Sequence, residues 1–157
     1  FRSDRFCFQI NIDYPAAEEE KRIVLQTTSG YHPEIVKVLT AADILNLQDI
    51  VRRVPVSQHV VDYAVNFVRA TRPKSANVPE FITRWVNWGA GPRASQNLVL
   101  AGKARAIING RFTVSEDDIR ALAAPVLRHR LVLNFTADAE GVRTEQVIQQ
   151  LLDQIKP

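Results

Sequence analysis

The chain has 157 residues, of which 46% are hydrophobic, so it can bury the core of one domain but is short for two ordinary domains. Its formal net charge of +3 is low for a dedicated nucleic-acid-binding protein of this length. The single cysteine excludes an internal disulfide bond and a cysteine-rich metal site, and we expect no metal site.

Hydropathy and the first residue bear on where the protein resides. No run of about 18 apolar residues is present, and no charged segment followed by an apolar one opens the chain. We therefore expect a cytoplasmic protein without a membrane span. The sequence contains no methionine, even at position 1, so we expect the chain to be a segment of a longer gene product.

The first 39 residues combine a strand pattern with a helix pattern. Apolar residues at positions 6, 8, 10 and 12 alternate with less apolar ones, and this period of two predicts a strand over 5–13. Three consecutive glutamates at 18–20 favour the first turn of a helix over about 16–27, and a connector follows. A lone strand is not stable. Either it pairs with another molecule, or its sheet lies in sequence before residue 1.

Helical periodicity governs the rest of the chain. Apolar residues recur at intervals of three and four from Thr40 onward, with Ser57 able to cap the second helix. A polar loop over 71–79 contains two prolines, and a short helix is expected over 80–86. We therefore predict a mainly α fold in which residues 40–157 form an all-helical bundle.

The second half of this region contains the clearest helices. One begins at Pro92 and ends at Gly110, and Ser115 can cap the next. Pro125 should kink or split that second helix. A terminal helix is expected from Thr144.

The stretch from Trp88 to Gln96 is the most informative in the sequence. Two glycines end one segment, and Pro92 suits the first position of the helix that follows. Arg93 then lies in the first turn, where free N–H groups and the helix dipole favour an anion. A phosphate or carboxylate partner would explain a cation there. A solvated or salt-bridged surface arginine is the alternative.

The sequence shows no complete active site of its own. Its three histidines lie in unrelated contexts, so no nucleophile–histidine–carboxylate set can be assembled. Gly102-Lys103 is superficially like a phosphate-binding loop, but the earlier glycine and the following Ser or Thr are missing.

Several stretches together resemble one family. Asp4-Arg5-Phe6, followed by the strand pattern and Tyr14-Pro15, resembles a segment late in the ATPase core of MoxR-type AAA+ proteins. Residues 89–95 are similar to the family's "GASPRAS", with Gly91 in place of the serine. The start of the family's helical lid is resembled by residues 47–51 and 68–72. Its C-terminal portion is resembled by residues 123–141. These matches are colinear and span nearly the whole chain.

The resemblance implies a domain organisation and two site arginines. Residues 1–39 would be the end of the α/β ATPase core, contributing the orphan strand and its helix, and 40–157 the all-helical lid. Arg93 would be the sensor 2 arginine at the γ-phosphate, with Gly91 and Pro92 beside the nucleotide. Arg5 would be the arginine finger that reaches a neighbouring subunit's nucleotide. Arg5 as an ordinary surface charge stays open.

The resemblance also implies cofactors and partners. The parent protein would use ATP and Mg²⁺, but its Walker A and Walker B motifs would lie upstream of residue 1, so this segment alone should bind neither tightly and hydrolyse no ATP. Its partners would be neighbouring subunits of a hexameric ring and a client protein that it remodels or activates.

Two interpretations without nucleotide chemistry stay open. One is a helical DNA-binding or protein-interaction module built on the helices after Arg93 and Ser115, supported by Lys103, Arg105 and Arg111. The other is a purely structural helical scaffold.

Overall fold

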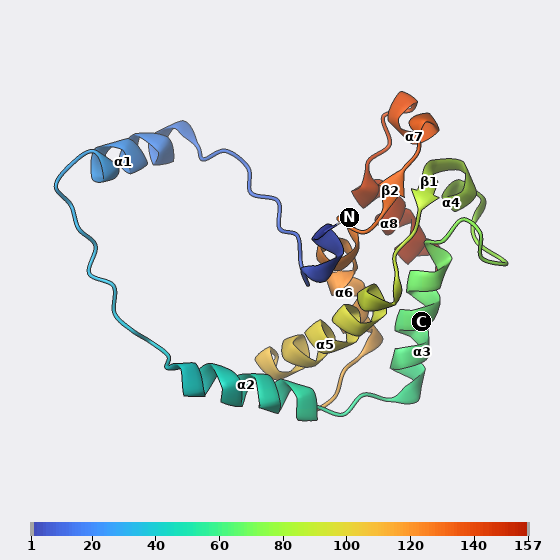
Figure 1. Cartoon of the computed structure of the whole chain (residues 1–157), viewed down its shortest axis with the longest axis horizontal. Coiled ribbons are helices and arrows are strands. Elements are labelled where there is room, and N and C mark those ends of the chain that lie inside the picture. The colour runs from blue at the N-terminus through green and yellow to red at the C-terminus, as the bar shows by residue number, and fades with distance from the viewer. Residues whose placement is uncertain (1, 157) are drawn as a thin grey trace.

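A computed structural model describes residues 2–156 and shows a mainly α-helical chain (Figure 1). In chain order its elements are a 3-10 helix Arg2–Arg5, α1 Ala17–Thr27, α2 Ala41–Arg53, α3 Gln58–Ala70, α4 Glu80–Trp85, β1 Val86–Trp88, α5 Pro92–Ile108, α6 Glu116–Leu127, β2 Val132–Leu133, α7 Phe135–Ala139 and α8 Thr144–Gln154. None of the helices in residues 2–156 is both long enough and apolar enough to cross a lipid bilayer.

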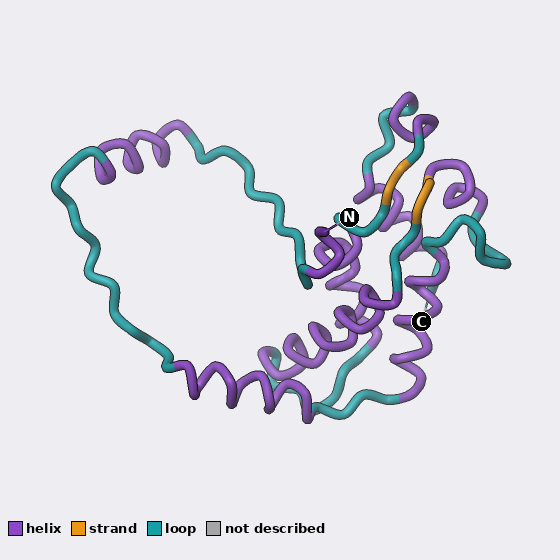
Figure 2. Tube along the Cα trace, viewed as in Figure 1, coloured by secondary structure: helices purple, strands orange, loops and turns teal. Residues whose placement is uncertain are grey.

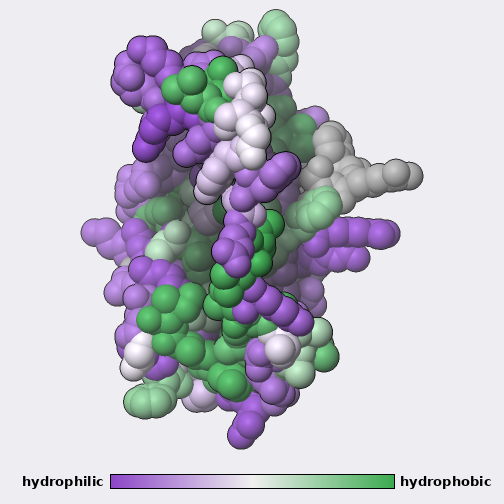
Figure 3. All heavy atoms as spheres, turned by 90° about the vertical axis from the view of Figure 1, so that its left-hand side faces the viewer, coloured by the Kyte–Doolittle hydropathy of each residue, from purple (hydrophilic) through white to green (hydrophobic). Residues whose placement is uncertain are grey.

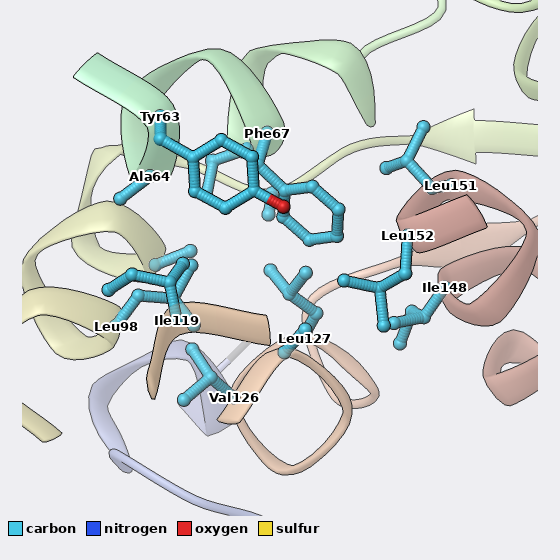
Figure 4. Close-up of a cluster of buried hydrophobic side chains, with 14 of the residues drawn as sticks. Tyr63, Ala64, Phe67, Leu98, Ile119, Val126, Leu127, Ile148, Leu151 and Leu152 are labelled. Carbon is cyan, nitrogen blue, oxygen red and sulfur yellow. The ribbon is translucent and has the colours of Figure 1, made fainter. Parts of the chain in front are cut away.

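The hydrophobic core lies where α3, α5, α6 and α8 meet. Figure 4 shows Phe67 of α3 and Leu98 of α5 facing Leu127 of α6, with Leu151 of α8 at the edge of the cluster. All four side chains are fully buried. Each of the four helices therefore buries apolar side chains in one shared core.

Local capping explains where these helices begin and end. The Ser57 hydroxyl accepts from the Val60 N–H at the start of α3, and Ser115 and Asp118 form a capping box at the start of α6. Helix α5 ends before Gly110, whose φ of 69° is the left-handed conformation that favours glycine.

Residues 10–40 leave this body as an arm that carries α1 (Figures 1 and 2). The predicted helix over 16–27 is confirmed as α1, but it buries no residue. Large apolar side chains stay exposed along the arm, among them Ile12 and Ile35 at 92% and 90%. Figure 3, which views the molecule from the left-hand side of Figure 1, shows such side chains beside polar ones.

The strand predicted over 5–13 is wrong for this structure. After the 3-10 helix, residues 6 and 7 form a bend and residues 8–16 an irregular segment, so no strand is formed here. A strand needs a partner ladder, and the two strands of the described residues pair with each other. Residue Gln9 instead donates its backbone N–H to the Pro125 carbonyl of α6 at 2.9 Å.

Two details of the region 40–157 also differ from expectation. The region is not all-helical, because β1 and β2 form a short antiparallel ladder that pairs Val86 with Leu133 and Trp88 with Val132. Strands this short leave no periodic signal in a sequence. Helix α6 is not split at Pro125 but runs through it and ends at Leu127.

A buried carboxylate ties α5 to α6. Asp118 is fully buried, and its Oδ1 accepts from Arg105 of α5 at 2.6 Å, while its Oδ2 accepts from Arg111 at 2.7 Å and from the Ser115 N–H at 2.9 Å. Burial raises the pKa of Asp118, but the hydrogen bonds from Arg111, Ser115 and Arg105 outweigh it and hold this pKa well below its usual range. The carboxylate is therefore ionised in the folded chain.

Removing this carboxylate should destabilise the fold. Asp118→Ala leaves Arg105 and Arg111 without their shared partner, and we expect the free energy of unfolding to fall by about 2 kcal/mol. Urea denaturation measures this loss. Asp117→Ala is the matched control, because Asp117 is the exposed neighbour in the same helical turn and should cost less than about 1 kcal/mol. Equal losses in both variants would contradict a special role for Asp118.

The same residue should make stability pH-dependent. A carboxylate whose pKa is depressed by folding contributes fully above its unfolded pKa of about 3.9, and the contribution is lost as pH falls through the lower folded pKa. We therefore expect the stability difference between the wild type and Asp118→Ala to be constant above about pH 5 and to shrink below about pH 4. A difference that stays constant down to pH 2.5 would contradict this expectation.

Candidate functional site

The turn before α5 is fixed to the end of α3 by close backbone contact. A Cβ at Gly89 would lie 2.4 Å from the Thr71 carbonyl oxygen, so only glycine fits there. The Thr71 hydroxyl accepts from the Ala90 N–H at 2.9 Å, and Arg72 Nε donates to the Ala90 carbonyl at 2.9 Å. The start of α5 is therefore held by a rigid support.

The predicted start of this helix at Pro92 is confirmed. Gly91 is the N-cap, in an extended conformation with φ of −82°, and Pro92 is the first helical residue. Both belong to the predicted site. Arg93 follows in the first turn with 57% of its side chain exposed, so its guanidinium is accessible from solvent.

A carboxylate lies at this guanidinium. Arg93 Nη1 is 3.3 Å from Oδ2 of Asp4, a residue 89 positions earlier in the chain. The structure thus shows a carboxylate partner, and this exposed ion pair equally fits the salt-bridged surface arginine that the sequence left as the alternative. It also brings Arg93 next to the stretch Asp4-Arg5-Phe6, which contains the other predicted site arginine.

A buried arginine that the sequence did not single out organises this stretch. Arg130 follows α6, and its Nε donates to Asp4 Oδ1 at 3.1 Å. Its Nη2 donates to the carbonyls of Asp4 and Phe6 at 3.1 and 2.6 Å, and its Nη1 to the carbonyls of Cys7 and Val126. Only 1% of the Arg130 side chain is exposed. No local pattern marks such a role, because every partner except Val126 is more than 120 residues away in sequence.

Arg5 itself is exposed at the end of the 3-10 helix. Its neighbours on both sides, Asp4 and Phe6, have their carbonyls bound by Arg130, so the backbone around Arg5 is held while its side chain faces solvent. The structure brings Arg5 and Arg93 into one region through Asp4.

Two hollows flank the turn. The larger, of about 560 Å³, is bounded by Asp4, Asn87, Trp88, Gly89, Gly91, His129, Arg130, Leu131 and Val132. The smaller, of about 220 Å³, is bounded by Arg72, Pro73, Lys74, Asn87, Trp88, Gly89, Ala90 and Gly91. Trp88 lies at both and is 70% exposed, whereas Trp85 packs against the core and donates its indole N–H to Glu140.

The titratable side chain His129 lies at the larger hollow. Burial lowers the pKa of His129, although the hydrogen bond between its Nε2 and the Phe6 carbonyl, 3.0 Å long, acts in the opposite direction. The imidazole is therefore neutral at physiological pH. Within residues 2–156 no group of three or more His, Cys, Asp and Glu side chains gathers to hold a metal ion.

Comparison with known proteins relates part of this helical body to a known family. Residues 83–151 match the family model described as the AAA lid domain, a stretch that starts in α4, ends in α8 and includes all of α5. The part of the helical body from α4 to α8 is thus similar to an AAA lid domain, and Arg93 lies inside the matched stretch.

The individual relatives carry the name MoxR. The chain is 37% identical over 97% of its length to the Chaperone MoxR1 of Mycobacterium tuberculosis, of which it covers 40%. It is 30% identical over 96% of its length to the Protein MoxR of Paracoccus denitrificans, of which it covers 47%. A crystal structure of a candidate ATPase from Cytophaga hutchinsonii matches 99% of the chain with a TM-score of 0.86 and 29% identity, and the chain covers 47% of it.

These comparisons confirm the resemblance found in the sequence. The chain is related over almost its whole length to the C-terminal part of MoxR-type AAA+ proteins. It spans less than half the length of each of these relatives.

The rigid support of the turn can be tested with two glycines. Gly89→Ala forces a Cβ into the Thr71 carbonyl, and we expect it to lower the free energy of unfolding by about 1–3 kcal/mol. Gly91→Ala is the control, because nothing lies within 4 Å of its added Cβ and the change should stay within about 1 kcal/mol. Thermal and urea unfolding of both variants measure the difference, and similar values for the two would contradict the close approach at Gly89.

Proposed function

We propose that this chain supplies the end of the ATPase core, residues 1–39, and the helical lid, residues 40–157, of a MoxR-like AAA+ ATPase. In that protein ATP binding and hydrolysis drive chaperone-like remodelling or activation of partner proteins. The observation that carries the proposal is the placement of Arg93: it is solvent-accessible, sits in the first turn of an AAA lid helix, and is held there by a rigid turn.

Arg93 suits the role of sensor 2 on physical grounds. A guanidinium is always charged, and its planar fork matches the oxygens of a phosphoryl group. Placed on a fixed backbone, it can stabilise charge that develops on the γ-phosphate without reorganising during the reaction. The contact with Asp4 supports an anion-binding role, because it shows that an oxygen anion fits at this guanidinium. Gly91 and Pro92 set the position of the helix start.

Arg5 is proposed as the arginine finger for a neighbouring subunit. Its side chain is exposed while the backbone on both sides is held by Arg130, which is the arrangement that a group acting across an interface requires. An arginine supplied in this way can raise the rate of phosphoryl transfer on the order of 10³–10⁵-fold in other systems. The proposal therefore includes a homo-oligomeric ring, with a hexamer as the expected size.

The cofactors of the proposed ATPase are ATP and Mg²⁺. The accessible Arg93 guanidinium fits a nucleotide phosphate, but the described residues gather no carboxylate cluster, so we assign no magnesium ligand to this chain. The phosphate-binding loop, the metal ligands and hence the hydrolytic activity belong in this proposal to the ATPase core of the longer protein. A cytoplasmic location and an as yet unidentified client protein are part of the same proposal.

The contacts of three basic residues argue against the DNA-binding alternative. Lys103 Nζ donates to the Arg52 carbonyl at 3.0 Å, and Arg105 and Arg111 both bind the buried Asp118. The positive side chains that supported this alternative thus contribute to the packing of the lid, and a DNA phosphate would have to compete with these contacts.

The central test removes the Arg93 guanidinium from the full-length gene product. We expect Arg93→Ala to lower ATP turnover by about 10²-fold, because one preorganised donor to the developing charge is lost. Steady-state phosphate release measures turnover, and thermal unfolding shows whether the fold is retained.

Arg53→Ala provides the matched control for this experiment. Arg53 is also an exposed helical arginine with one carboxylate partner, Asp49 at 4.0 Å, but it lies on α2. Its loss should change turnover by less than about twofold. Wild-type turnover in folded Arg93→Ala would overturn the sensor 2 assignment and favour a structural scaffold.

A further inference from the structure

One carboxylate joins the arginine in the first turn of α5 to the arginine that follows α6. Asp4 Oδ2 is 3.3 Å from Arg93 Nη1, and Asp4 Oδ1 is 3.1 Å from Arg130 Nε. These contacts span 89 and 126 residues of sequence. Asp4 therefore connects the stretch that contains Arg5 with both the first turn of α5 and the end of α6.

The two ends of this bridge differ strongly in exposure. The Arg130 side chain is 1% exposed and donates four further hydrogen bonds to backbone carbonyls, so its contact with Asp4 is part of a buried network. The Arg93 side chain is 57% exposed and has Asp4 as its carboxylate partner. An exposed ion pair is weak and exchanges readily with other anions. The contact of Asp4 with Arg130 is thus an anchor, whereas another anion can replace Asp4 at Arg93.

We propose that Asp4 is a positioning residue whose carboxylate, anchored by Arg130, occupies the Arg93 guanidinium until the terminal phosphate of a bound nucleoside triphosphate displaces it. This inference rests on the proposed function of Arg93. The Asp4 carboxylate then competes with phosphate for Arg93, so the loss of the Asp4 contact offsets part of the affinity of Arg93 for phosphate.

The displacement also reaches Arg5. Arg130 binds the carbonyls of Asp4 and Phe6, which enclose Arg5, and these bonds do not involve the Asp4 carboxylate. When a phosphate takes the place of Asp4, the backbone at Arg5 therefore stays anchored while its link to α5 is released. The occupancy of one subunit's nucleotide site thereby sets how firmly the Arg5 stretch is tied to the lid of the same subunit.

The test measures nucleotide affinity in the full-length protein. Asp4→Asn keeps the shape of the side chain and an acceptor for Arg130 but removes the charge that competes with phosphate. We expect the Kd for ATPγS to fall by about 1.5–5-fold at low salt, the range that an exposed ion pair allows. The change should be smaller for ADP, which lacks the terminal phosphate, and should shrink at 0.5 M salt. Titration calorimetry measures all of these values.

Three further variants separate competition from a structural effect. Asp4→Glu keeps the carboxylate and should bind ATPγS like the wild type. Asp4→Ser removes the charge by a different route, should tighten binding as Asp4→Asn does, and covers the case in which Asp4→Asn folds poorly. Asp49→Asn is the matched control, because it neutralises an exposed aspartate–arginine pair on α2 and should leave the Kd unchanged.

The outcomes distinguish this inference from the proposed function. In an Arg93→Ala background, Asp4→Asn should no longer tighten ATPγS binding, because the competitor acts only through Arg93. Weaker binding in Arg93→Ala together with unchanged or weaker binding in both charge-removing Asp4 variants overturns the inference and leaves the sensor 2 assignment standing. Unchanged ATPγS binding and turnover in Arg93→Ala overturn the proposed function itself, and the inference with it.

Discussion

The arrangement of the helical body depends above all on the buried carboxylate of Asp118. It caps α6 through the Ser115 N–H and at the same time binds Arg105 of α5, so it fixes two helices with one side chain. Gly102 lets α5 pack closely against the segment that precedes α6, because a Cβ at position 102 would lie 2.9 Å from the Val114 side chain. A buried ion pair costs desolvation energy, and its contribution is best understood as fixing one arrangement of α5 against α6.

Fixing α5 at both ends gives Arg93 its position. The C-terminal half of α5 is bound to α6 through Arg105, and the turn before its first residue is bound to α3 through Gly89, Ala90 and Thr71. A helix held in this way cannot slide or rotate without breaking buried contacts. The backbone at Arg93 is therefore fixed, even though the side chain of this residue is exposed.

The N-terminal arm shows the opposite situation. Helix α1 buries no residue, and α2 also buries none although it contacts α5. The exposed side chains Ile35 and Val38 lie between these helices. Large exposed apolar surfaces generally mark contacts with another domain or protein. Since the chain spans less than half of its relatives' length, the ATPase core of the proposed longer protein is the partner that would cover them.

The extent to which sequence predicts this structure depends on how local each signal is. Helices α1, α3, α5, α6 and α8 could be placed from periodicity and capping residues, and the order of Gly91, Pro92 and Arg93 at the start of α5 was likewise readable. The strand over 5–13 was wrong because alternation describes a strand's faces but cannot supply its partner. The β1–β2 ladder was missed because strands of three and two residues carry no period.

The candidate site divides in the same way. The sequence by itself determined that an arginine lies in the first turn of a helix. The signals for this are local, since a glycine, a proline and a helical period of apolar residues follow one another within this stretch. Only the tertiary structure decided that Asp4 meets Arg93 and that Arg130 is buried against residues 4–7. Those contacts join residues 89 and 126 positions apart, and such pairings depend on how the helices pack rather than on any short stretch of residues.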